Sequence, residues 1–285
     1  MDTSDLAKRM KGYEERNRYY LQRRMPVILR LDMRAGHGFT KGFVRPFDEV
    51  FIKTMQETAK YLCENIQGCK LSYQQSDEIT LVLVDYDKLN TDCFFDYRVD
   101  KLCSIAASMA TMAFNKAFRK NVNDWWFTPF SGITKEFQER VTLYKTYKNA
   151  IEKGAMFDCR CFNIPKEEVT NLVYWRQLDA SRNSIQMVGQ ANFSHKELQN
   201  KSCNDIQDML MTREGINWND LPIYQKRGSC CVRNKIIIST DGIKGTALLQ
   251  DTSKSENEWI IDTKIPIFKN EDREYIDRLV YVSEE

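Results

Sequence analysis

The feature that most constrains this fold is a pair of acidic segments, each placed where a β-rich run gives way to a loop. The first run, Pro26–Asp32, ends in Arg-Leu-Asp. Two further β-rich runs flank a polar turn: Lys70–Tyr73 and Ile79–Val84, on either side of Gln74–Glu78. Short apolar runs bounded by polar clusters are typical of strands. We therefore expect a strand that ends at Asp32 and a hairpin whose turn carries Asp77 and Glu78.

Helical patterns alternate with these strands. After Pro46, apolar residues recur four positions apart, at Phe51, Met55 and Ala59, which indicates a helix. A second long helix is expected over Arg98–Arg119, followed by a strand over Met156–Phe162. The order strand, helix, hairpin, helix, strand is that of the ferredoxin-like fold. We therefore predict an α+β palm, in which helices cover one face of an antiparallel sheet.

The pattern changes after Pro165, where helices and a hairpin are expected to extend the palm. Lys166–Asn192 is a predicted helix, and Asn270–Val282 is a predicted closing helix. Two β-rich stretches between them are expected to form a hairpin: Lys235–Thr240 and Glu258–Ile267. We predict two parts of the chain, a catalytic palm over 1–165 and a helical and hairpin extension over 166–285.

Composition narrows the class of protein. Apolar content of 42% and charged content of 29% are ordinary for a globular chain. The net charge of +2 does not by itself require a nucleic-acid partner. No apolar run approaches the roughly 18 residues that span a bilayer, and the charged N-terminus lacks a secretory core. Nine cysteines without a secretory context favour a reducing compartment. We expect a cytoplasmic protein that does not contact membranes.

The two strand-end acids point to metal chemistry. A lone carboxylate in a β-rich run is costly to bury unless it is paired or bound to metal. The first strand and the central hairpin are neighbours in a ferredoxin-like sheet, so Asp32 and Asp77 would share a small space. A divalent cation relieves their repulsion, and hard oxygen ligands suit Mg²⁺. The spacing leaves an alternative open, in which Asp32 caps a loop and Asp77–Glu78 is only a polar turn.

A set of short motifs follows in a fixed order between residues 25 and 230. They are RLDMRAGHGF (30–39), FVRPFD (43–48), QSDE (75–78), RVDK (98–101), FDCR (157–160), WRQLD (175–179) and PIYQKRG (222–228). In this order they resemble the tRNA-His guanylyltransferase superfamily, specifically its Thg1-like 3′-to-5′ polymerase branch. The QSDE segment alone would be a weak signal, whereas the ordered set is specific.

The resemblance implies a role for each matching residue. Asp32 and Asp77 would bridge two Mg²⁺ ions, the carbonyl of Met33 would be a further ligand, and Glu78 would support the catalytic site. Nucleotide contacts are implied for His37, Gly38, Phe39, Arg45, Ser76, Arg98, Lys101, Lys226 and Arg227. RNA contacts are implied for Arg176, Asn183 and Lys196. Met33 and Gly36 depart from the Gly and Phe that the family usually carries.

The implied activity is template-dependent addition of nucleotides to the 5′ end of tRNA, as in 5′-end repair. ATP would activate a 5′-monophosphate, and GTP or another NTP would be the nucleotide added. The resemblance also implies a homotetramer. The 166–285 extension would complete the active site and the RNA-binding surface. Ser181 stands where the guanylyltransferases have histidine, which favours repair over the alternative of adding one G to tRNA-His. A non-catalytic RNA-binding palm and a nucleotide cyclase-like enzyme remain further alternatives.

Overall fold

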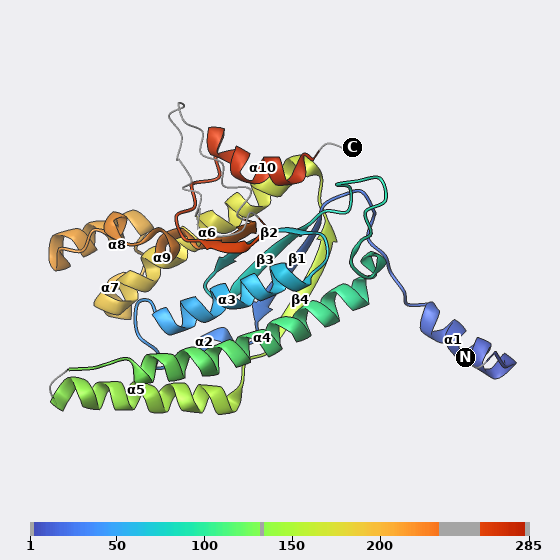
Figure 1. The fold of residues 1–285 in the computed structure, drawn as a ribbon. Helices are drawn as coiled ribbons and strands as arrows, with labels where there is room; N and C mark the ends of the chain where they lie inside the picture. Colours follow the sequence, from blue (N-terminus) through green and yellow to red (C-terminus); the bar gives the residue numbers. More distant parts are fainter. Residues whose placement is uncertain (1–2, 132–133, 234–256, 283–285) are drawn as a thin grey trace.

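One antiparallel sheet organises the computed structural model, which describes residues 3–131, 134–233 and 257–282 (Figure 1). Its six strands lie in the order β4-β1-β3-β2-β5-β6. They are β1 (Val27–Met33), β2 (Cys69–Gln75), β3 (Glu78–Leu83), β4 (Phe157–Asn163), β5 (Ser229–Arg233) and β6 (Trp259–Asp262). The order of the first four strands is that of a ferredoxin-like sheet. The predicted α+β fold is therefore confirmed.

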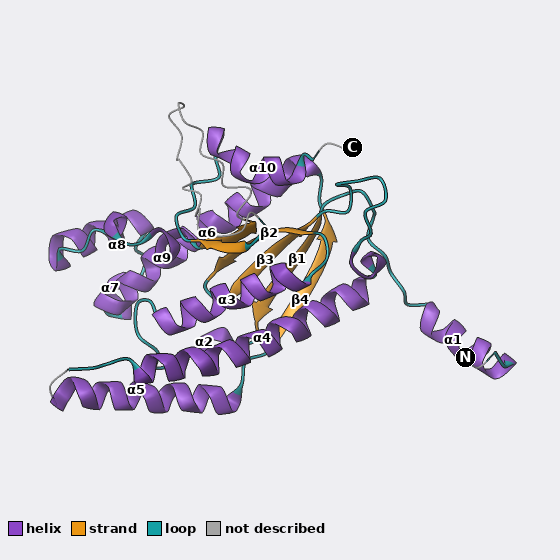
Figure 2. Cartoon of the chain, viewed as in Figure 1, coloured by secondary structure: helices purple, strands orange, loops and turns teal. Residues whose placement is uncertain are grey.

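Two long helices cover one face of the sheet, α3 (Glu49–Asn65) and α4 (Val99–Phe127) (Figure 2). The side chains of Leu29 and Leu31 on β1 pack with Met55 and Phe114 in one buried cluster. Side chains alternate between the faces of a strand, so the odd-numbered residues of β1 point to these helices. The even-numbered residues of β1, including Asp32, point to the other face.

The segment after Pro165 covers that other face and widens the sheet. Helix α6 (Lys166–Asn192), whose bounds are as predicted, packs there with α10 (Glu274–Val280). A second buried cluster joins Ile28 and Val82 of the sheet to Val173 and Ile276 of these helices. β5 pairs with β2 on one side and with β6 on the other. The strand expected over Lys235–Thr240 lies outside the described residues.

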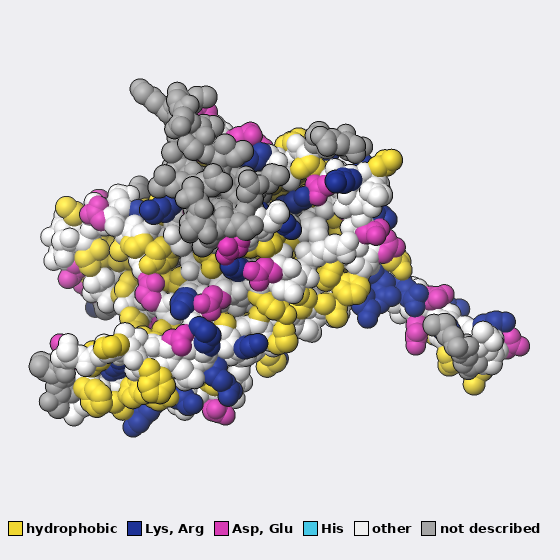
Figure 3. Space-filling model, viewed as in Figure 1, with side chains coloured by type: hydrophobic (Ala, Val, Ile, Leu, Met, Phe, Trp, Pro, Cys, Tyr) yellow, Lys and Arg dark blue, Asp and Glu magenta, His cyan; other side chains and the backbone are white. Residues whose placement is uncertain are grey.

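The remaining helices lie around this sandwich. They are α1 (Asp5–Glu15), α2 (Gly36–Phe39), α5 (Thr134–Lys153), α7 (His195–Leu198), α8 (Cys203–Met209) and α9 (Ile223–Arg227). Helices α4 and α5 run side by side, and hydrophobic side chains gather at their tip, where Phe127, Phe130 and Phe137 are exposed (Figures 1 and 3). Among the helices of the described ranges, none is long and apolar enough to cross a membrane.

Candidate functional site

Asp32 lies in a row of carboxylates that crosses three strands. Its Cα atom faces Glu78 on β3 and Asp158 on β4, so the three side chains share the α6 face of the sheet. Burial raises the pKa of Asp32, and the negative charges of Asp77, Glu78 and Asp158 raise it further, whereas Arg160 lowers it. This position therefore favours a bound cation that would keep Asp32 ionised.

Asp77 reaches the same end of β1 from the turn between β2 and β3. Ser76 has a left-handed backbone with φ of 48°, and the Met33 N–H donates to the Asp77 carbonyl at 3.1 Å. A Cβ atom on Gly36 would stand 1.9 Å from Oδ2 of Asp77. Gly36 thus makes room for the carboxylate, which gives a physical reason for its departure from the family pattern. Met33 is an ordinary strand residue and does not need the freedom of glycine.

Glu78 is held by arginines instead of facing open space. Arg176 Nε and Nη2 donate to Oε1 and Oε2 of Glu78 at 2.7 and 2.9 Å, and Arg30 Nη2 donates to Oε2 at 2.7 Å. Arg176 also donates to Asp179 at 3.0 Å and is only 6% exposed. The RNA contact expected of Arg176 stays a prediction, and in this structure its guanidinium is buried against carboxylates of its own chain. Glu78 and Arg176 support the turn that carries Asp77.

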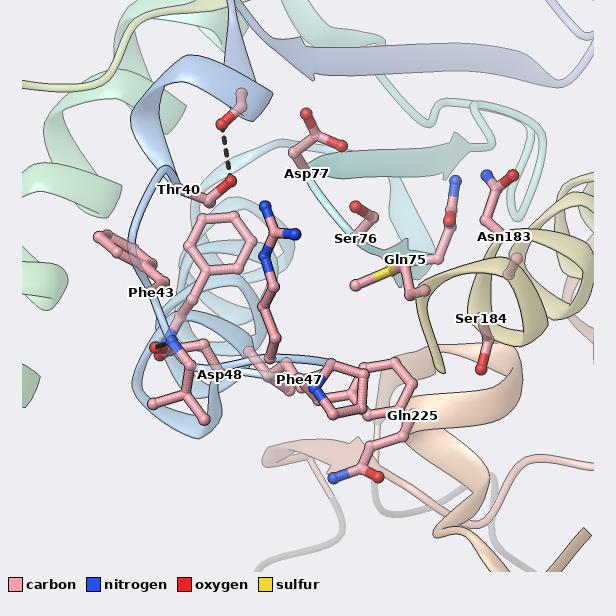
Figure 4. Close-up of a pocket in the computed structure, with 18 of the residues that line it drawn as sticks. Thr40, Phe43, Phe47, Asp48, Gln75, Ser76, Asp77, Asn183, Ser184 and Gln225 are labelled. Carbon is pink, nitrogen blue, oxygen red and sulfur yellow. Dashed lines mark hydrogen bonds between the residues drawn. The ribbon is translucent and has the colours of Figure 1, made fainter. Parts of the chain in front are cut away.

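A cavity of about 310 Å³ opens beside Asp77, between the loop that follows α2, the β2–β3 turn, α6 and α9 (Figure 4). Four of the residues expected to bind nucleotide or RNA line it: His37, Arg45, Ser76 and Asn183. Sequence reasoning missed several other lining residues, among them Thr40, Lys41, Phe47, Gln74, Gln75, Met187, Gln190 and Gln225. The cationic and amide side chains of the lining suit a ligand that has an anionic group and a polar ring.

Asp48 fixes the loop that forms one wall of this cavity. Its buried carboxylate accepts hydrogen bonds from the N–H groups of Val44 at 3.0 Å and Phe51 at 2.9 Å, and so caps α3. The hydroxyl of Tyr147 on α5 donates to Oδ2 of Asp48 at 2.6 Å. Helix α5 thereby braces the cavity wall from behind.

We expect Tyr147→Phe to lower the free energy of unfolding by about 1.5–3 kcal/mol, because it removes a buried hydrogen bond to a charged acceptor. Urea denaturation measures this change. Tyr144→Phe on the same helix is the control, since the Tyr144 ring stacks on Trp126 at 4.2 Å and should cost less than about 0.5 kcal/mol. Equal losses for the two variants would contradict the bracing role.

Arg98 and Lys101 lie at the far end of the sheet from the carboxylates. Arg98 bridges to Tyr20 near the start of β1, and its guanidinium donates to Asp100 at 2.8 and 3.1 Å. The part of α4 near Asp32 is the region of Thr111, whose hydroxyl accepts from the Phe157 N–H. Arg98 begins α4 about 20 Å from there. The triphosphate contact expected of Arg98 and Lys101 stays a prediction, and within this chain the two residues lie away from Asp77.

The basic turn before β5, residues 226–228, contains side chains with different roles. Lys226 is buried, and its ammonium donates to the carbonyl of Asn219; burial, and next the charge of Arg227, lower the pKa of Lys226. Burial lowers the pKa of Arg227, whose buried Nε has no hydrogen-bond partner among the described residues. Gly228 has φ of 80°, and a Cβ there would stand 2.4 Å from the Gln74 carbonyl. Only Gly228 of this turn lines the cavity, and Arg227 stays available to an anion.

Three other expected contacts fall outside the cavity lining. The Phe39 side chain is 4% exposed and packs edge-on against Phe43 and Phe114, so its role is in the core. Gly38 is exposed on α2, and Lys196 is exposed on α7. Neither residue lines the cavity.

Comparisons with known proteins give the family and the fold of the chain. A model described as tRNAHis guanylyltransferase (Thg1) matches residues 7–165. A bacterial Thg1-like protein solved in complex with ATP superposes with a TM-score of 0.76 at 39% identity, covering 98% of this chain and 100% of that chain. One solved in complex with GTP gives 0.68 at 35% identity, covering 97% and 100%. The tRNA(His) guanylyltransferase of Saccharomyces cerevisiae is 26% identical over 226 residues, which are 74% of this chain and 84% of that protein.

Proposed function

We propose, from the premise that this chain belongs to the tRNAHis guanylyltransferase family of 3′-to-5′ nucleotidyltransferases, that it repairs the 5′ end of tRNA by template-dependent nucleotide addition. The observation that carries this proposal is the placement of Asp32 and Asp77 beside a cavity with cationic and amide side chains. The cavity would hold the nucleotide, and the carboxylates would face its phosphates.

The cavity residues suit ATP or GTP, the nucleotides named for the bacterial relatives. Lys41 and Arg45, the cations of the lining, would hold phosphate oxygens, and His37 would contact the nucleotide. The amide side chains of Gln74, Asn183 and Gln225 would face the base, because amides offer both donors and acceptors. The hydroxyl of Ser76 would add a hydrogen bond at the turn.

The donor set fits Mg²⁺. No group of three or more His, Cys, Asp or Glu side chains is placed to hold a metal in the described parts of the chain. Mg²⁺ in phosphoryl-transfer sites commonly takes one or two carboxylates and completes its shell with phosphate oxygens and water. Asp32, Asp77 and the carbonyl of Met33 would hold two such ions, and the crowding that raises the pKa of Asp32 favours them. Bound Mg²⁺ would neutralise charge on the transferring phosphate.

The reaction makes and breaks only phosphate bonds. An oxygen of the RNA 5′-monophosphate attacks the α-phosphorus of ATP and expels pyrophosphate. The 3′-hydroxyl of the added nucleotide then attacks the activated RNA phosphorus and expels AMP, whereas an RNA that carries a 5′-triphosphate loses pyrophosphate directly. The protein's part is positioning and charge neutralisation: Arg45 would offset phosphate charge, His37 would contact the nucleotide, and the carboxylates would hold Mg²⁺.

Two features of α6 bear on the choice of RNA. Ser181, at the position of the family histidine, donates to the Gln177 carbonyl within its own helix at 3.0 Å. Asn183, two residues further along α6, lines the cavity. The family histidine, which would check one tRNA, is thus replaced by a hydroxyl that makes its hydrogen bond within its own helix. This replacement favours repair of several tRNAs. We infer that tRNA is the partner and that the chain acts as a homotetramer.

The test is an extension assay on tRNA transcripts that lack one or two 5′ nucleotides, with each NTP supplied singly. We expect the RNA to lengthen only with the nucleotide that pairs with the opposite base, and a change of that base should change the nucleotide used. Faster addition of G to full-length tRNA-His than to truncated RNAs would favour the guanylyltransferase alternative. Binding without lengthening, or a cyclic nucleotide product, would contradict the proposal.

Gly36 gives a sharper prediction about the same site. We expect Gly36→Ala to lower kcat for nucleotide addition about a hundredfold, because the new Cβ displaces the Asp77 carboxylate and misplacement by about 1 Å is that costly. Gly38→Ala is the matched control, since a Cβ there would approach only Lys153 Nζ, at 3.9 Å. Equal activity of the Gly36 variant and wild type would show that Asp77 need not occupy this place.

A further inference from the structure

Helix α6 leaves a strip of the sheet open next to Asp32. The strip lies on β4, the edge strand, where the side chains of Asp158 and Arg160 are 62% and 58% exposed. Trp175 on α6 stands beside the strip and is 52% exposed, whereas the adjacent Arg176 is buried. A half-exposed tryptophan next to a row of carboxylates and arginines is not accounted for by packing of the core.

Two arginines face each other across this strip. Arg30 on β1 and Arg160 on β4 are direct cross-strand partners, so their side chains share one face. Like charges at such positions are destabilising. Among the described residues, the one ion pair of Arg160 is a 3.9 Å contact from Nη2 to Oδ1 of Asp158, and the buried Nε of Arg30 has no hydrogen-bond partner. An anion placed between the two arginines would relieve both deficits.

The Trp175 ring is held in a fixed place by cations. The guanidinium carbons of Arg30 and Arg176 lie 5.6 and 4.7 Å from the centre of the ring. Both arginines are tied to Glu78 at 2.7 Å, so the ring is fixed relative to the carboxylate row. Arg30 precedes Asp32 by two residues on one face of β1, a spacing of about 7 Å. The exposed side of the ring is therefore within a nucleotide's reach of Asp32.

We propose that this face, made by Trp175, Arg30, Arg160 and Asp158, receives the 5′ end of the RNA. The terminal base stacks on Trp175, and a backbone phosphate lies between Arg30 and Arg160. Aromatic rings beside basic side chains form the usual platform for unpaired nucleic acid. None of these four residues lines the nucleotide cavity, so the RNA end and the nucleotide reach the carboxylates from different sides. This inference rests on the proposed function, because it assigns the place of its RNA substrate.

The test uses a 5′-truncated tRNA with 2-aminopurine as its terminal base, whose fluorescence falls on stacking. We expect wild type to quench the probe, Trp175→Ala to lose the quench and to bind the RNA about five- to hundredfold more weakly, and Trp175→Phe to keep part of both. Arg160→Gln should weaken binding and reduce the slope of log affinity against log salt by about one. The affinity for ATP alone should not change in either variant.

Phe127→Ala is the control, because Phe127 is 80% exposed at the tip of α4 and far along that helix from the strip. An unchanged quench and RNA affinity in Trp175→Ala would overturn the inference, and so would a loss of ATP affinity in place of RNA affinity. Failure of the proposed function would be seen in a different experiment, in which wild type lengthens no truncated tRNA. Circular-dichroism melting is expected to show that Trp175→Ala and Trp175→Phe fold alike.

Discussion

Replacing Asp77 or Asp32 with Asn is expected to lower kcat for nucleotide addition by at least about a thousandfold. The carboxylates supply the negative charge that holds divalent ions against the transferring phosphate, and loss of several kcal/mol of this stabilisation translates into that rate. Asn keeps the size of the side chain and leaves the hydrogen bond from Met33 to the Asp77 carbonyl in place. Single-turnover extension of a 5′-triphosphorylated RNA measures the chemical step free of activation.

Asp124→Asn is the control for this prediction, since Asp124 is an exposed carboxylate on α4 that pairs with Lys120. Its activity should stay within about twofold of wild type. RNA binding by Asp77→Asn should also be retained, because its fold and basic residues are unchanged. Full activity of Asp32→Asn or Asp77→Asn would contradict the assignment of the two acids as the charge centre of the site.

Removing Arg176 is expected to have the largest effect on stability. Among the described residues, Arg176→Gln leaves the buried carboxylate of Glu78 with Arg30 as its only cationic partner, and breaking such a pair costs about 3–5 kcal/mol of unfolding free energy. Glu78→Gln should cost a similar amount, because it removes the Glu78 charge from the buried guanidinium of Arg176. Urea denaturation of the two single variants and the double variant gives the coupling energy, expected to exceed about 1.5 kcal/mol.

Arg182→Gln is the matched control on the same helix. Arg182 also pairs with Asp179, but its side chain is 61% exposed, and exposed pairs contribute less than about 1 kcal/mol. Additive losses in the double variant would contradict the direct pairing of Arg176 with Glu78. Loss of nucleotide addition without loss of stability would instead assign Arg176 to contact with substrate.

Much of the fold can be predicted from local sequence patterns. The hairpin turn at Asp77 and the bounds of α6 follow from apolar runs and polar breaks, and β1, expected to end at Asp32, ends one residue later at Met33. Helices on the second face were not expected, although the run Val27–Leu31, apolar at every position except Arg30, signals a strand buried on both sides. Helix α5 was also missed, because its polar sequence shows only a weak apolar stripe.

The site was harder to predict, because motifs give residue types and not directions. Arg98 belongs to a motif, yet α4 carries it to the far end of the sheet. Arg176 is polar and reads as a surface residue, yet an ion pair with Glu78 allows its burial. Tyr147, which contacts Asp48, and Arg30, which contacts Trp175, come from elements distant in sequence, and one sequence does not reveal such pairings. Asp32, near the end of β1, and Asp77, in the turn before the adjacent β3, are close enough for their charges to interact, and their joint role in holding metal stays a prediction.

The central claim is that this chain lengthens RNA at the 5′ end and that Asp32 and Asp77 hold the divalent ions for this reaction. The measurement that tests it most directly is single-turnover extension of a 3′-labelled, 5′-triphosphorylated truncated tRNA by wild type and Asp77→Asn, with Mg²⁺ and the pairing NTP. The account predicts a product one nucleotide longer for wild type, with its label intact, and a rate at least about a thousandfold lower for Asp77→Asn. No lengthening by wild type, or equal rates for both proteins, would contradict it.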